Sequence, residues 1–320
     1  DIEKGAVDIA RLRFWLSIVV DEETPSPLPN LDYKIMQGNS LIESFMGVDL
    51  SKLTYEKEYK KDKGEISLFD DEKNRLQKTV SHLLSSYYSC SDHDRKLKLQ
   101  QEISDTINKQ LEAQAYNPEI LRELGAINLA ENNKFFLWHT WFSDVFSRDD
   151  KEGFDIVIGN PPYITYRGKE KNSISDSELN NLIATYTHSA EYKVNSYALF
   201  TEAGINICNN RGTISYIIPG TILQNDYLKK IREFLICRNQ IKEIVSFSNK
   251  VFDAVTDSII LRCKKGFVEN NTMLFKRVSD LSLVRADQYL AQTLNIPDVA
   301  GVQINGLPGP TAVEQLYYAY

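Results

Sequence analysis

Residues that build metal sites and disulfides are scarce in this chain of 320 residues. It has four cysteines (Cys90, Cys208, Cys237 and Cys263) and four histidines, and neither type shows the short spacing of a zinc site. Scattered cysteines favour reduced thiols in a cytosolic protein over a disulfide framework. We therefore expect a cytoplasmic protein without a metal ion.

Long apolar runs and an excess of basic residues are also missing. No apolar segment is long enough to cross a membrane and no basic-then-apolar leader is present, so we expect neither a transmembrane helix nor a secretory signal. The net charge of −7 argues against a generic nucleic-acid-binding protein, although one face can oppose the total. With 42% hydrophobic and 25% charged residues, the composition is that of a globular protein with a sizeable core.

The first 126 residues carry mainly helical patterns. Asp1 is not a methionine and leads directly into a predicted helix over residues 4–19, so we interpret the chain as a fragment of a longer protein. Three prolines follow, and then a predicted short strand at Tyr33–Met36. Residues 50–126 are charged and nearly free of glycine and proline, and they predict a helical hairpin with SLFDDEK as a loop inside it. Apolar residues there recur at every fourth position, as on one face of a helix: Leu99, Ile103, Ile107 and Leu111.

Strands and helices alternate in the second half of the chain. The patterns predict strands over 154–158, 211–219, 241–247 and 257–265, and helices within 176–209 and over 227–237. This alternation predicts a parallel α/β sheet. The short connection between the last two strands predicts that this pair is antiparallel. The aromatic segment 133–146 is predicted to pack in a core.

The strand predicted at 154–158 ends in the sequence GNPPY. Ligands of open α/β sheets bind beyond the carboxyl ends of the strands, which is where this turn lies. Pro161 and Pro162 stiffen the turn, because proline fixes its own φ and restricts the residue before it. The Asn160 amide and the Pro161 carbonyl are then two fixed acceptors that can draw an exocyclic amine toward tetrahedral geometry and free its lone pair. Tyr163 offers a flat face for a planar ring.

NPPY after a strand that ends in glycine resembles the catalytic loop of S-adenosylmethionine-dependent amino-methyltransferases, which include DNA adenine-N6 and protein-glutamine N5 enzymes. Further segments occur in the order found in the large adenine-N6 methyltransferases of restriction–modification systems: DIEKGAVDIARLRF, LPNLDYKIMQGNSLIESF, VNSYALFTEAGINI, GTISYIIPGTIL and VFDAVTDSIILRCKK. Together they resemble the TaqI-type (gamma-class) group, including long forms with fused methylation and cleavage and BREX-like relatives. The resemblance covers roughly residues 1–275. It implies a Rossmann-like sheet, parallel with one antiparallel strand, that binds S-adenosylmethionine.

The resemblance also implies cofactor-binding residues. Asp1 would hold the ribose hydroxyls, Ile2 would pack on the adenine, and Asn39 would read the adenine edge, with Ser40 as a further cofactor-binding residue. Phe200 would contact the adenine ring. Three of these residues have a simpler alternative: Asp1 as a helix cap, Asn39 as a turn former and Phe200 as ordinary helix core.

A second set of residues would contact double-stranded DNA. A base inside a duplex must be flipped out to reach such a pocket, and Tyr163 with Phe252 would stack on its two faces. Arg167, Lys169 and Lys171 form a basic loop after the motif that would contact phosphates. The alternatives are strand-end packing for Phe252 and a solvated loop for the three basic residues.

The resemblance divides the chain into a methyltransferase domain in two parts (1–49 and 127–275), a helical insertion (50–126) and the start of a target-recognition domain (276–320). The family's glycine-rich cofactor loop is expected before Asp1, so this chain alone would bind the cofactor weakly or not at all. No nuclease motif is evident, so a nuclease or specificity module would lie outside the chain. The predicted function is site-specific methylation of adenine N6. Protein-glutamine N5 methylation and a non-catalytic DNA-binding fragment stay open as alternatives.

Overall fold

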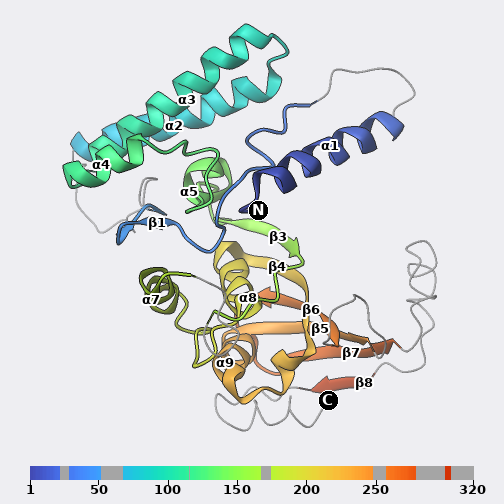
Figure 1. The fold of residues 1–320 in the computed structure, drawn as a ribbon. Helices are drawn as coiled ribbons and strands as arrows, with labels where there is room; N and C mark the ends of the chain where they lie inside the picture. Colours follow the sequence, from blue (N-terminus) through green and yellow to red (C-terminus); the bar gives the residue numbers. More distant parts are fainter. Residues whose placement is uncertain are drawn as a thin grey trace. The chain divides into compact units, whose positions relative to one another are not determined.

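The structure is a computed structural model that describes residues 1–21, 29–51, 68–114, 116–166, 174–247, 257–278 and 300–303. The chain divides into two compact units, Asp1–Ser147 and Arg148–Tyr320. Figure 1 draws the helices and strands of both. Among the described residues, no helix is long and apolar enough to cross a membrane.

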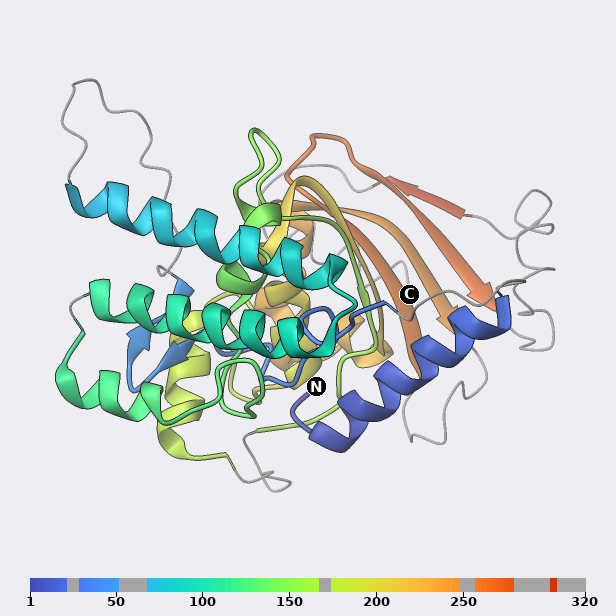
Figure 2. The ribbon, with the colours of Figure 1, turned by 90° about the horizontal axis from the view of Figure 1, so that it is seen from above.

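The first unit is mostly helical. Its elements are α1 (Lys4–Asp21), β1 (Ser44–Phe45), β2 (Val48–Asp49), α2 (Leu68–Ser89), α3 (His93–Ala113), α4 (Pro118–Gly125), α5 (Trp138–Trp141) and α6 (Ser143–Phe146). Helices α2 and α3 lie side by side (Figures 1 and 2). The four apolar residues at every fourth position of α3 are all buried, which confirms the predicted helical hairpin. The loop predicted at SLFDDEK is wrong, because α2 begins at Leu68, and this acidic stretch suits the first turns of a helix.

A turn replaces the strand predicted at Tyr33–Met36. The N–H groups of Lys34 and Ile35 both donate to the Leu31 carbonyl, at 3.0 and 2.8 Å. Arg11 of α1 donates to two further carbonyls of this segment, at 2.9 and 3.1 Å. These contacts come from a residue more than twenty positions away, so the strand prediction could not anticipate them.

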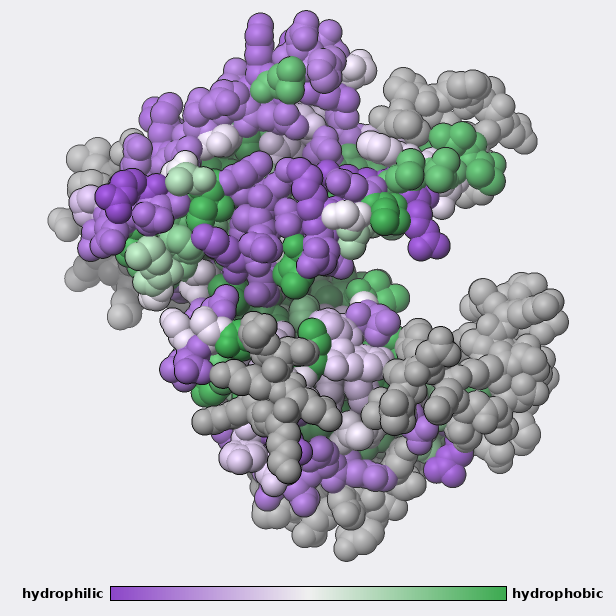
Figure 3. All heavy atoms as spheres, viewed as in Figure 1, coloured by the Kyte–Doolittle hydropathy of each residue, from purple (hydrophilic) through white to green (hydrophobic). Residues whose placement is uncertain are grey.

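Helix α1 confirms the predicted N-terminal helix but buries little of its apolar surface. Val7 is 3% exposed, whereas most other large apolar side chains of α1 are more than half exposed. Figure 3 shows hydrophobic atoms gathered over this helix. The exposed residues are Ile9, Leu12, Phe14, Leu16, Val19 and Val20.

The aromatic segment packs in the core of the first unit, as predicted. Phe135 and Leu137 are fully buried and Trp141 is 3% exposed. His139 joins this segment to Glu43, which accepts from the His139 backbone N–H at 2.9 Å and contacts the ring Nδ1 at 2.8 Å.

The second unit is built on a six-stranded sheet with the order β3-β4-β6-β5-β7-β8. Its strands are β3 (Phe154–Gly159), β4 (Cys208–Pro219), β5 (Asn239–Phe247), β6 (Ser258–Lys265), β7 (Thr272–Val278) and β8 (Ala300–Gln303). The helices are α7 (Asp176–Thr185), α8 (Ser196–Ile207) and α9 (Lys229–Cys237), with 3₁₀-helices η2 (Gly220–Leu223) and η3 (Asp226–Leu228). The α/β prediction is therefore confirmed.

Strand directions follow the predicted scheme, and the sheet has two further strands, β7 and β8. Strands β3, β4, β5 and β7 run the same way, and β6 runs against its neighbours β4 and β5, as predicted for the last two strands. Neither β7, which is parallel to β5, nor β8, which is antiparallel to β7, was predicted. The sheet thus continues past residue 275, through β7 and β8. Assignment of 276–320 to a target-recognition domain stays a prediction, and most of that segment lies outside the described residues.

Alternate side chains of β4 form the centre of the core. Ile214 and Ile218 are fully buried and Tyr216 is 6% exposed, and they pack with residues of α8 and α9. Gly204 of α8 faces the Tyr216 ring so closely that a Cβ there would lie 3.0 Å from the ring carbon Cζ. The absence of a side chain at position 204 therefore sets how near α8 lies to β4.

A charged network joins three neighbouring strands. Glu243 of β5 pairs with Lys276 of β7 at 2.8 Å and with Arg262 of β6 at 3.1 Å. Burial alone would raise the pKa of Glu243, but the hydrogen bond and charge of Lys276, with the charge of Arg262, lower it overall.

Candidate active site

The predicted motif lies at the carboxyl edge of the sheet in the second unit. Strand β3 ends at Gly159, which is opposite Tyr216 of β4. Pro219, at the end of β4, is opposite Ser258, where β6 begins, and β5 ends near it at Phe247. One edge therefore collects the ends of β3, β4 and β5 and the start of β6.

Neither predicted acceptor has a hydrogen-bond donor among the described residues. The Asn160 side chain is exposed, and neither it nor the Pro161 carbonyl accepts a hydrogen bond within the part of the chain that the structure describes. The next carbonyl differs, because Pro162 accepts from the Ser196 hydroxyl. In the described structure, the Asn160 side chain and the Pro161 carbonyl are thus free acceptors, whereas the Pro162 carbonyl that follows them anchors the turn to Ser196. Their catalytic roles stay predictions.

Tyr163 is half-buried against the core. Its hydroxyl donates to the Ile217 carbonyl at 3.3 Å, and its ring meets Tyr197 edge-on, with centroids 6.2 Å apart. Burial raises the pKa of Tyr163 more than a hydrogen bond with the Ser258 side chain lowers it, so the phenol is neutral at pH 7. The ring is held in place, and its stacking on a base stays a prediction.

The chain after the motif pairs with the start of α8. The N–H of Ile164 donates to the Ser196 hydroxyl at 2.9 Å, and the N–H of Ser196 donates to the Ile164 carbonyl at 2.8 Å. Thr165 and Asn195 form an antiparallel bridge, in which the Thr165 hydroxyl donates to the Asn195 side chain at 3.0 Å. Our sequence reasoning missed Asn195 and Ser196. An Asn-Ser pair before an apolar helix reads as a cap, yet the Asn195 side chain makes no capping bond.

The structure brings four predicted cofactor residues together in the first unit. The N–H of Gly38 donates to the Asp1 carbonyl at 2.8 Å, and Gln37 donates to the Ile2 carbonyl at 2.8 Å. Asn39 and Ser40 follow directly, so residues 1–2 and 38–40 lie side by side. Gly38 is required here, because a Cβ would lie 2.6 Å from the Phe136 ring.

The simpler alternatives for three of these residues are visible in the geometry. One oxygen of Asp1 accepts the Glu3 N–H at 2.9 Å, as in a helix cap, and its other oxygen has no partner among the described residues. Asn39 accepts the Leu41 N–H at 3.2 Å, as in a turn. Phe200, on α8 in the second unit, packs against the core. None of these contacts excludes a ligand, and the cofactor roles stay predictions.

The four remaining predicted DNA contacts lie outside the described residues: Arg167, Lys169, Lys171 and Phe252. The residues on either side of the segment that contains Phe252 are described. Phe247 ends β5, and the Asp257 carbonyl accepts the Gly220 N–H at 2.7 Å. The segment with Phe252 therefore starts and ends at the carboxyl edge.

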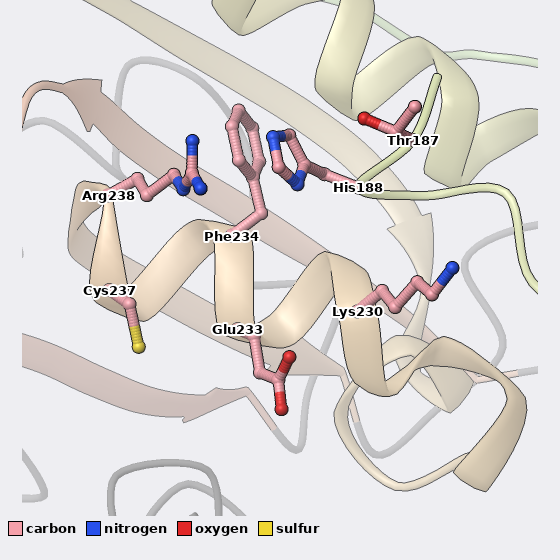
Figure 4. A pocket seen from close by; sticks show the side chains of 7 residues that line it. All are labelled: Thr187, His188, Lys230, Glu233, Phe234, Cys237 and Arg238. Atoms are coloured by element: carbon pink, nitrogen blue, oxygen red, sulfur yellow. The ribbon is translucent and has the colours of Figure 1, made fainter. Parts of the chain in front are cut away.

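A separate cavity of about 480 Å³ lies along α9 (Figure 4). His188 stacks on Phe234 in it, with ring centroids 4.9 Å apart. No predicted site residue lines it; the lining residues are Thr187, His188, Lys230, Glu233, Phe234, Cys237 and Arg238. In the described part of the chain, no group of three or more His, Cys, Asp or Glu could hold a metal ion.

An α/β sheet with an NPPY turn at its carboxyl edge and two free acceptors in that turn has the features of an amino-methyltransferase. The chain belongs to the Eco57I restriction-modification methylase family, which matches residues 1–252. The family match confirms the predicted methyltransferase family, and with it S-adenosylmethionine as the methyl donor of such enzymes.

Two restriction–modification proteins and one solved structure illustrate what the chain is similar to. The chain is 33% identical to the type II restriction enzyme and methyltransferase RM.Eco57I of Escherichia coli, over 43% of this chain and 14% of that protein. It is 27% identical to the type II methyltransferase M.AccI of Acinetobacter calcoaceticus, over 44% of this chain and 26% of that protein. Among solved structures, the type IIG restriction endonuclease BpuSI gives a TM-score of 0.38 at 14% identity, over 81% of this chain and 32% of that one. The chain thus spans about a quarter or less of the curated relatives it matches.

Proposed function

We propose that the natural protein transfers a methyl group from S-adenosylmethionine to the N6 amine of an adenine flipped out of double-stranded DNA, as part of a restriction–modification system. The observation that supports this most is the pair of free acceptors, the Asn160 side chain and the Pro161 carbonyl, at the end of β3 in a methylase family. An exocyclic amine has two N–H bonds, so two acceptors satisfy both. The relatives named as type II methyltransferases favour DNA over protein glutamine as the substrate class.

The residues of the turn have two kinds of role, hydrogen bonding to the amine and stacking on the base. The two acceptors accept hydrogen bonds from the two N6 N–H groups and leave the nitrogen lone pair directed at the incoming methyl carbon. Tyr163, fixed by its hydroxyl and by Tyr197, presents a ring for the base to stack on. The N–C bond would form as the bond from the methyl carbon to the donor's sulfonium sulfur breaks and leaves a neutral thioether, and the nitrogen would then lose one proton to water.

The cofactor supplies an electrophilic methyl group when bound. In the first unit, the Asp1 oxygen that has no partner among the described residues suits a ribose hydroxyl, and the Asn39 amide nitrogen is a further donor. This acceptor and this donor fit the polar groups of a nucleoside. In the second unit, Phe200 is half-buried and would supply an aromatic contact.

The test is methyl transfer by the protein at its natural length. Radiolabelled methyl uptake into duplex DNA, followed by nucleoside analysis, should give N6-methyladenine. Asn160→Ala should lower the rate about 10²–10³-fold, as loss of one preorganised polar group does, and should leave cofactor binding unchanged. Asn180→Ala is the matched control, because Asn180 is exposed on α7 of the same unit.

Each other outcome has a definite meaning. Normal activity of Asn160→Ala would overturn the role of Asn160. Label on another base would overturn adenine specificity, and label on a protein glutamine would support the N5 alternative. If the protein binds the cofactor but transfers no methyl group to any substrate, only the alternative of a non-catalytic DNA-binding protein remains.

A further inference from the structure

Ser196 is the residue that fixes the catalytic turn from outside it. Its side chain is fully buried at the first position of α8. Its hydroxyl donates to the Pro162 carbonyl and accepts the Ile164 N–H at 2.9 Å. A serine hydroxyl has a single proton, and here that proton is used on the motif.

The prolines leave one kind of freedom that Ser196 removes. A proline ring fixes φ but not ψ, and Pro162 also restricts Pro161 before it, so the peptide after Pro162 is the one that can still rotate. The bond from Ser196 holds the peptide after Pro162, and the bond from Ile164 holds the chain two residues further on. The backbone bond between Ser196 N–H and the Ile164 carbonyl, at 2.8 Å, keeps α8 in register with this segment. With the next peptide fixed, the Pro161 carbonyl has little room to turn.

We propose that Ser196 is a positioning residue for methyl transfer, which sets the direction of the Pro161 carbonyl through Pro162 and so completes the pair of acceptors. This inference rests on the proposed function. It assigns a role to a side chain that never contacts the base or the cofactor. Its loss should slow the chemical step and leave binding of both substrates intact.

The chain offers a matched control on the same helix. Thr201 of α8 is also fully buried, and its hydroxyl donates only within the helix, to the Tyr197 carbonyl at 2.7 Å. Thr201→Val and Ser196→Ala each delete one buried hydroxyl from α8. Only the second deletes a contact with the motif.

The experiment measures steady-state methyl transfer to duplex DNA, cofactor binding and thermal unfolding for the protein at its natural length. Ser196→Ala should lower kcat about 10- to 100-fold, the range that a misplacement near 1 Å produces, with KM for DNA and Kd for the cofactor unchanged. Ser196→Cys keeps a weaker donor and acceptor, so its kcat should lie between those of the wild type and Ser196→Ala. Thr201→Val should keep the wild-type kcat.

Two results would overturn the proposal. One is a Ser196→Ala variant whose kcat equals that of Thr201→Val. The other is a loss confined to KM or cofactor binding. If Ser196→Ala does not fold, a wild-type kcat for Ser196→Cys overturns it instead. If the wild-type protein itself transfers no methyl group, the proposed function is refuted. This outcome is distinct from failure of the Ser196 proposal, because it is seen in the wild type without any substitution.

Discussion

Adding one methyl group at position 204 should destabilise the second unit, although the same change usually stabilises a helix. Gly→Ala in a helix gains about 1 kcal/mol of helix propensity. In α8, however, the new Cβ would lie 3.0 and 3.2 Å from two carbons of the Tyr216 ring, and nearest of all to its hydroxyl oxygen. Overpacking of this kind costs about 1–3 kcal/mol. The net loss for Gly204→Ala is therefore up to about 2 kcal/mol, which lowers Tm by up to about 8 °C in a unit of this size.

Calorimetric unfolding of three further variants tests the reasoning. Gly5→Ala in α1 is the control, since nothing lies within 4 Å of a Cβ there, and it should be neutral or stabilising. Tyr216→Phe removes the closest atom, so it should restore most of the stability of Gly204→Ala in the double variant. A Gly204→Ala protein as stable as the wild type would refute the argument, as would a double variant no more stable than Gly204→Ala alone.

Three further substitutions probe burial and charge. Glu243→Gln should cost about 1–3 kcal/mol at pH 7, because it leaves Lys276 unpaired. The pKa of Glu243 is lowered in the fold, so this stabilisation is present above its ordinary value of 4.5 and is lost as the pH falls through the lowered pKa. The stabilities of the two proteins in urea unfolding should therefore converge as the pH falls below 4.5. Burial raises the pKa of Glu202 above 4.5, so the wild type should lose stability relative to Glu202→Gln as the pH rises from that value. Urea unfolding measures the difference in free energy of unfolding between the two proteins, and a difference that does not change with pH would contradict this. Gly38→Ala places a Cβ 2.6 Å from the Phe136 ring, so it should lower Tm and cofactor affinity together in thermal unfolding and equilibrium binding.

The strands and helices of the second half were predictable because their signals are local. Apolar runs predicted β3, β4, β5 and β6, with glycine or proline next to all of them except β5, and the short connection predicted the antiparallel pair. The errors occurred where distant contacts decide. Tyr33–Met36 alternates like a strand, but Arg11 holds that segment as a turn.

The candidate site shows the same division. Two adjacent prolines make NPPY stiff, and the motif directly follows a predicted strand. Its rigidity and its position at the end of that strand could therefore be predicted from the sequence. The contacts of Ser196 could not, because its partners Pro162 and Ile164 lie 34 and 32 positions away. Cofactor residues were placed by resemblance alone, and the structure brings Asp1 and Asn39 together through backbone bonds that no local pattern encodes.

Reversal of β6 has a consequence for how such an enzyme can diversify. In a purely parallel sheet, each strand reaches the carboxyl edge and must return through a crossover. Strand β5 instead ends at that edge at Phe247, and β6 begins at Ser258 and runs back beside it within the sheet. Closing a longer connection costs only about 0.6 kcal/mol per doubling of its length. The connection of a reversed strand pair is therefore a position where insertions are inexpensive and new specificity can be tried.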